Sequence, residues 1–233
     1  MRSLPDISKW NAKNIHDLGL IFKDCISLKS FPNISRWINK NIYNLTIFGD
    51  YPPLPECDNG INIKIVLNGE SGVGCNTLAH RATGKEFISE SAVLNYCYTP
   101  IKFFVNYREI EVSLLNGPGQ ERFRSLSKFF LKNANIIIFV YDITYKQSFD
   151  YLDERIEMAK KLLENKFIGA IIANKNDLFL EEKINEEKGR EFANKQNYKF
   201  YLVSAKDNPQ AFINCLDELV KDYILANHPD LLK

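Results

Sequence analysis

The sequence predicts an α/β fold, in which a mostly parallel sheet of five or six strands carries helices on both faces. From residue 61 onward, short apolar segments rich in β-branched residues alternate with longer segments whose apolar residues recur at helical spacing. Strands that are apolar throughout are buried on both faces, which requires helices above and below the sheet. Polar motifs follow several of these strands, and folds of this class bind ligands at the carboxyl ends of their strands.

The individual elements follow from the same two patterns. The strand candidates are residues 61–67, 101–105, 109–115, 135–141, 168–173 and 199–203. The second and third of them flank Asn106 and Tyr107 and predict a hairpin. Helices are predicted after Gly74 through Leu78 and over residues 125–133, 148–165, 181–196 and 209–224.

The first 50 residues have a different texture and contain an internal repeat. The segment LPDISKW at residues 4–10 returns as FPNISRW at residues 31–37, so that Trp10 and Trp37 lie 27 residues apart. A fixed period of this length indicates a solenoid, and the motif resembles the leucine-rich repeats of bacterial surface proteins. Fewer than two repeats cannot bury their apolar faces alone, so the segment either packs against the following domain or is the remnant of a longer array.

The repeat pattern predicts a division of the chain into three parts. Three prolines between residues 51 and 55 indicate a stiff linker, which we place at residues 51–59. The leucine-rich-type segment is then residues 1–50, and the α/β domain is residues 60–228.

Composition and charge argue against several classes of function. There are 30 Lys and Arg residues against 29 Asp and Glu, a net charge of +1, which gives no reason to expect nucleic acid or an anionic membrane as a partner. Five scattered cysteines without a CxxC pair indicate a reduced, cytoplasmic compartment and no zinc site. No apolar run reaches transmembrane length, and the final residues NHPDLLK offer no cysteine for prenylation.

A glycine-rich segment follows the first strand and opens a helix, which is the context of a phosphate-binding loop. Backbone N–H groups of such a loop converge on phosphate at the positive end of the helix. The full motif continues with Lys and then Ser or Thr, where this sequence has cysteine and asparagine. The candidate phosphate-binding residues are Gly69, Ser71, Gly72, Val73, Gly74, Cys75 and Asn76. An ordinary glycine turn is the alternative for the loop taken alone.

Three further motifs carry a resemblance to Rab-like small GTPases of the Ras superfamily. The segment NGPGQERFRS, residues 116–125, resembles the DTAGQERFRS switch of that family, with seven of ten positions identical. VYDIT at residues 140–144, followed by Ser148 and Phe149, resembles another Rab motif. NKND at residues 174–177 and SAK at residues 204–206 resemble the guanine-binding motifs. The resemblance covers roughly residues 60–227 in the family's order, and it implies a Ras-like P-loop nucleotide-binding fold with GTP or GDP as ligand.

The resemblance assigns the reading of guanine to the last two motifs. The implied residues are Asn174, Lys175, Asp177, Ser204, Ala205 and Lys206. Asp177 would accept hydrogen bonds from guanine N1 and the exocyclic amine, a pair of donors that adenine lacks. Asn174 would tie the loops together, Lys175 would lie along the base, and the backbone of Ala205 would meet O6. A polar turn in which Asp177 caps a helix is the alternative that the residues alone leave open.

The phosphate and magnesium positions depart from the family pattern. Cys75 stands where the family has a lysine, whose charge about 4 Å from a phosphate is worth roughly 4 kcal/mol at an effective dielectric of about 20. The neutral amides of Asn76 and Asn116 stand where the family holds Mg²⁺ with a hydroxyl and a carboxylate. Thr77 would replace Asn76 only if the helix shifted by one residue. We therefore assign no metal ligand, since the family's positions hold Asn76 and Asn116.

The two switch segments are altered as well. The switch I threonine position falls at Val93, which cannot coordinate a metal, although Ser91 and Thr99 are nearby. Gly119 and the water-orienting Gln120, the family's catalytic position, are retained. A positioned water is of little use without charge on the transferred phosphoryl group, and Pro118 stiffens the turn.

Together these motifs predict a divergent Rab-like GTPase with weak guanine-nucleotide binding and slow or absent hydrolysis. It would serve as a cytosolic signalling or trafficking interaction module, whose protein effectors the sequence does not identify. Two alternatives stay open. One is a competent GTPase with non-standard Mg²⁺ and phosphate ligands, and the other is a nucleotide-free scaffold.

Overall fold

The computed structural model describes residues 61, 63–87, 98–105, 108–116 and 130–232. The chain divides into two units, Met1–Pro55 and Glu56–Lys233, and all described residues belong to the second. The predicted repeat, the linker and most of the helix predicted over residues 125–133 lie outside the described residues. Their boundaries therefore stay predictions.

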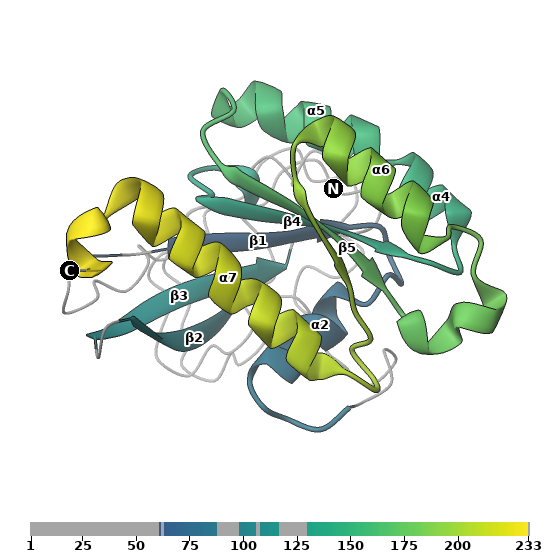
Figure 1. Cartoon of the computed structure of the whole chain (residues 1–233), viewed down its shortest axis with the longest axis horizontal. Coiled ribbons are helices and arrows are strands. Elements are labelled where there is room, and N and C mark those ends of the chain that lie inside the picture. The colour runs from purple at the N-terminus through teal and green to yellow at the C-terminus, as the bar shows by residue number, and fades with distance from the viewer. Residues whose placement is uncertain (1–60, 62, 88–97, 106–107, 117–129, 233) are drawn as a thin grey trace, which may run out of the picture. The chain divides into compact units, whose positions relative to one another are not determined.

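Six strands of the described residues form one sheet, in the order β2-β3-β1-β4-β5-β6. They are β1 Ile63–Gly69, β2 Tyr98–Val105, β3 Arg108–Asn116, β4 Ile136–Asp142, β5 Ile168–Asn174 and β6 Lys199–Leu202. Neighbouring strands pair in parallel except for the β2–β3 hairpin, which is antiparallel. The predicted mostly parallel sheet is confirmed, and it brings the carboxyl ends of β1, β3, β4 and β5 to one edge (Figure 1).

Helices cover both faces of this sheet (Figure 1). On one face lie α2 Cys75–Ala82 and α7 Pro209–Asn227, and on the other lie α4 Lys146–Asp150, α5 Leu152–Leu163 and α6 Glu186–Gln196. A short 3₁₀ helix, η4 Pro229–Leu232, follows α7. None of the helices in the described part of the chain is long and apolar enough to cross a membrane.

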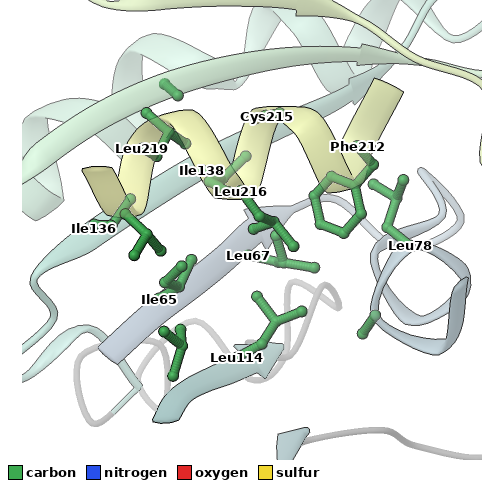
Figure 2. Packing of buried hydrophobic residues seen from close by; sticks show 14 of the residues in the cluster. Ile65, Leu67, Leu78, Leu114, Ile136, Ile138, Phe212, Cys215, Leu216 and Leu219 are labelled. Atoms are coloured by element: carbon green, nitrogen blue, oxygen red, sulfur yellow. The ribbon is translucent and has the colours of Figure 1, made fainter. Parts of the chain in front are cut away.

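A hydrophobic core lies between the sheet and the helices α2 and α7 (Figure 2). Side chains from β1, β3 and β4 meet those of α7 and α2 there: Ile65, Leu67, Leu114, Ile136, Ile138, Leu78, Phe212, Cys215, Leu216 and Leu219. On the other face, Phe139 and Tyr141 of β4 are likewise fully buried, and Tyr141 packs edge-on against Phe149 of α4. Burial on both faces explains why β4 is apolar from Ile136 to Tyr141.

Two predicted helices differ from those observed. The helix predicted over residues 148–165 is two helices, α4 and α5, which meet at Tyr151, and the chain leaves α5 through Glu164 and Asn165 at positive φ. The helix predicted from residue 181 begins only at Glu186, after the 3₁₀ helix η3 Asn176–Glu181.

The late start of α6 has a backbone cause. Glu182, at φ −58° and ψ 138°, leaves the helical conformation, and the N–H groups of Lys183 and Ile184 donate to the carbonyl of Ile143, at 2.7 and 3.2 Å. The side chain of Asn185 then accepts a hydrogen bond from the N–H of Lys188 and caps α6.

A buried lysine on β1 makes the stability of this domain depend on pH. Lys64 is 6% exposed, and its Nζ donates to the carbonyl of Lys132 at 2.7 Å. Burial lowers the pKa of Lys64 from 10.5 to about 8. Between these two values the unfolded chain holds a proton that the folded chain has released, so the contribution of Lys64 to stability rises with pH.

We therefore expect wild-type protein to gain free energy of unfolding relative to Lys64→Met as the pH rises from about 8 to 10.5. Urea denaturation of both proteins across this range measures the difference, and the comparison cancels the titration of tyrosines and cysteines common to both. A difference that stays constant, or that falls with rising pH, would contradict the assignment.

Candidate functional site

The glycine-rich segment forms a tight loop between β1 and α2, as the sequence predicts. Gly72 and Gly74 have φ of 85° and 96°, in the left-handed region that glycine adopts without steric cost. A Cβ at Gly69 would lie 2.6 Å from the carbonyl oxygen of Val140 on β4. The loop therefore lies against β4 at a distance that only glycine permits, while Ser71 is exposed.

The loop ends at the amino end of α2. Gly74 is the N-cap residue, and α2 forms no side-chain cap hydrogen bond in the described part of the chain. A helix end without a side-chain cap suits an anion, because the first-turn N–H groups carry partial positive charge. Cys75, at the family's lysine position, is buried at 8% exposure and belongs to the apolar core together with Val73.

An asparagine pair joins α2 to the end of β3. Asn116, the last residue of β3, donates a hydrogen bond from Nδ2 to Oδ1 of Asn76 in the first turn of α2. Asn116 is 9% exposed, and its own Oδ1 is buried without a partner among the described residues. The helix is not shifted by one residue: Asn76 is the residue that contacts Asn116, while Thr77 is buried at 2% exposure. The described residues contain no cluster of three or more His, Cys, Asp or Glu side chains that could hold a metal ion.

Asn174 links three loops at the carboxyl edge of the sheet. It ends β5 and is 1% exposed. Its Nδ2 donates to the carbonyl of Val73 in the glycine loop at 2.8 Å, and its Oδ1 accepts from the N–H of Ala205 at 3.3 Å. One buried amide thus connects the glycine loop to the NKND and SAK motifs.

Asp177 and Ser204 connect the NKND and SAK motifs a second time. The hydroxyl of Ser204 donates to Oδ1 of Asp177 at 2.6 Å and accepts from the N–H of Asp207 at 2.9 Å. The N-cap of η3 is Lys175, with φ of 66°, and no side-chain cap bond forms there. The alternative reading of Asp177 as a helix cap is therefore wrong.

The lysine of the NKND motif contacts an aspartate that the sequence had not singled out. Nζ of Lys175 lies 2.9 Å from Oδ2 of Asp142, which ends β4 and is 5% exposed. Oδ1 of Asp142 accepts hydrogen bonds from the N–H and hydroxyl of Thr144, at 2.8 and 2.7 Å. The Asp-x-Thr spacing in VYDIT is a sequence signal for this turn. Lys206 of the SAK motif is exposed.

A second unpredicted contact reaches the glycine loop from α5. Arg155 is 8% exposed; its Nη1 donates to Oδ1 of Asn68 at 2.7 Å, and its Nη2 bonds to the carboxylate of Glu70. No sequence pattern marked Arg155, because one arginine on an amphipathic helix is ordinarily on the solvated face.

Several predicted positions lie outside the described residues. They are Gly119, Gln120 and Pro118 of the second switch and Val93 and Ser91 of the first. Two surface hollows of about 390 and 400 Å³ adjoin Tyr198 and Lys199 at the amino end of β6. They lie at the other end of the strands from the glycine loop and hold none of the predicted site residues.

The mostly parallel sheet, the glycine loop and the linked NKND and SAK motifs define a protein of the small GTPase class. A model of the Ras family matches residues 64–223, and the chain belongs to that family. Its relatives include the Ras-related protein RabC of Dictyostelium discoideum, 31% identical over 162 residues that cover 68% of this chain and 82% of RabC. The Ras-related protein Rab-30 of Homo sapiens is 31% identical over 146 residues, or 62% of this chain and 72% of Rab-30. The Ras-related protein RABA4c of Arabidopsis thaliana is 29% identical over 170 residues, covering 72% and 76% of the two chains.

Proposed function

We propose that this chain is a divergent Rab-like protein that binds GDP and GTP weakly, with little help from Mg²⁺, and hydrolyses GTP slowly or not at all. The hydrogen bond between Asn116 and Asn76 carries the proposal. It joins the two positions at which the family holds the metal, while Asn174 still links the base-binding loops. Because GTP hydrolysis is slow or absent, the role left to the fold is to bind other proteins, as a signalling or trafficking module.

The residues present do not fit a magnesium ion. Mg²⁺ is a hard cation that demands near-ideal octahedral geometry and is usually held through carboxylates and phosphate. Asn116 and Asn76 are neutral, and the oxygen of Asn76 would have to give up the hydrogen bond from Asn116 before it met a metal. Cys75 supplies no positive charge to phosphate and is packed into the apolar core.

These losses lead to an estimate of affinity. Several hydrogen bonds to guanine, each involving a charged group and worth about 1.5–3 kcal/mol, would supply roughly 5–8 kcal/mol in total. That corresponds to dissociation constants between about 1 µM and a few tenths of a millimolar. GDP and GTP should bind about equally, because the residues that sense the γ-phosphate in the family are replaced.

The test is the nucleotide content of freshly purified protein, read by mass spectrometry after denaturation, followed by calorimetry with GDP and GTP in Mg²⁺ or in chelator. We expect little retained nucleotide, similar weak affinity for both ligands and no effect of the chelator, with ATP as the control for base selection. Tight binding that collapses in chelator would instead support a competent GTPase with other ligands. No guanine-nucleotide binding at millimolar concentration would support the scaffold.

A further inference from the structure

The contact between Arg155 and Glu70 brings a cation to the start of the glycine loop. Arg155 belongs to α5, which lies on the opposite face of the sheet from α2 (Figure 1). The side chain reaches the carboxyl end of β1, where it bonds to Asn68 and Glu70 together. The side chains of Arg155 and Glu70 are 10% and 13% exposed, so this ion pair is largely removed from water.

The glycine loop carries one negative charge and no positive charge of its own, so the ion pair with Arg155 affects how the loop meets an anion. Within residues 69–76, GESGVGCN, Glu70 is the one Asp, Glu, Lys or Arg residue, because the family's lysine position is Cys75. A phosphate entering the loop would therefore meet a carboxylate on the loop itself. Repulsion between like charges is strong where the dielectric is low, and a partner of opposite sign removes most of it.

We propose that Arg155 is a positioning residue of the glycine loop, which holds the carboxylate of Glu70 against α5 and cancels its charge so that a nucleotide phosphate can approach. The inference rests on the nucleotide binding proposed above. It predicts that Arg155 acts on the phosphate of the ligand and not on its base, since the base-binding contacts of Asn174 and Asp177 involve other residues.

The test compares GDP with guanosine, which lacks phosphate, by NMR titration of wild type and three variants at pH 7.5. Arg155→Met should weaken GDP about tenfold more than guanosine, because Glu70 is left uncompensated. Glu70→Gln should tighten GDP severalfold and leave guanosine unchanged, because the charge of Arg155 then acts on phosphate. Glu70→Gln combined with Arg155→Met should bring the ratio of the two affinities back close to that of wild type.

The sign of the Glu70→Gln effect separates this role from a merely structural one. Loss of a structural ion pair weakens both ligands, whereas loss of the carboxylate alone tightens GDP. The Glu70→Gln variant also tests the proposal if Arg155→Met fails to fold. The matched control is Arg190→Met, which removes an Arg–Glu pair with Glu186 on the exposed side of α6, where the side chains are 54% and 46% exposed. Equal effects on GDP and guanosine in all variants would overturn the proposal.

Hydrogen exchange tests the positioning without any ligand. Amides of residues 70–76 should exchange faster in Arg155→Met than in wild type, and Arg190→Met should leave them unchanged. If wild type binds no guanine nucleotide, the proposed function fails while this measurement still decides whether Arg155 orders the loop. Unchanged exchange in Arg155→Met would then overturn the inference.

Discussion

The combined variant Cys75→Lys, Asn76→Thr and Asn116→Asp is expected to bind GDP about a thousandfold more tightly than wild type, and only in the presence of Mg²⁺. One unit-charge contact about 4 Å from phosphate is worth roughly 4 kcal/mol at an effective dielectric of about 20, which sets the scale of the gain, and without bound Mg²⁺ the rest of the phosphate charge stays uncompensated. The backbone that would use this charge is already formed, because Gly72 and Gly74 hold the left-handed conformations of the loop. Threonine and aspartate would replace the asparagine pair with oxygen ligands suited to Mg²⁺.

The three single variants should achieve far less than their combination. Asn116→Asp alone removes the donor of the hydrogen bond and sets a carboxylate beside the oxygen of Asn76. Asn76→Thr alone leaves the amide of Asn116 without this acceptor, and Cys75→Lys alone leaves the metal positions unchanged. Residues that act as a unit are non-additive, so the coupling energy is itself the diagnostic quantity.

Calorimetry of the single, double and triple variants, with Mg²⁺ and with chelator, measures this coupling. Hydrolysis should remain slow in the triple variant, because Val93 still offers no ligand and Pro118 still fixes its turn. If wild type already shows strong Mg²⁺-dependent binding, the electrostatic explanation fails. If the triple variant folds and gains nothing, the pocket has been reshaped and the scaffold takes precedence.

The sheet and its loops were predictable because their signals are local. Apolar runs such as IIIFVY mark strands buried on both faces, and the β4 strand Ile136–Asp142 is fully buried as expected. Glycines at 72 and 74 mark a turn that needs positive φ, and both have it. The start of α6 was placed too early because residues 181–184 look helical, while the backbone is extended at Glu182 and the N–H groups of Lys183 and Ile184 bond to Ile143, which is distant in sequence.

The site contacts that the sequence did not predict are all made between distant segments. Arg155 and Glu70 are 85 positions apart, and Asn116 and Asn76 are 40 apart. Composition and periodicity place each residue on its element but do not say which side chain it will meet across the sheet. The family resemblance implied that Asn174 connects the loops but named no partner. The structure identifies its two partners, Val73 and Ala205.

Asn174→Ala is expected to lower the free energy of unfolding by about 2–4 kcal/mol and to abolish guanine-nucleotide binding. The substitution leaves the carbonyl of Val73 and the N–H of Ala205 without their bonds in a site where Asn174 is 1% exposed. Each buried group left unsatisfied costs about 1–3 kcal/mol. The amide also sets the distance between the glycine loop and the SAK motif. Without it, the sites proposed for the phosphate and for the base are no longer held at the spacing that one nucleotide needs.

The control for this variant is Asn185, an asparagine whose side chain has a single backbone partner. Asn185 caps α6 from an exposed position, so Asn185→Ala should cost about 1 kcal/mol and leave nucleotide binding unchanged. Urea denaturation and GDP titration of both variants make the comparison. Asn174→Asp adds a sharper arm: it keeps an acceptor for Ala205 but removes the donor to Val73 and buries a charge, so it should destabilise at least as much as alanine. If Asn174→Ala binds GDP as wild type does, the three loops do not act together, and the base-binding site proposed here is wrong.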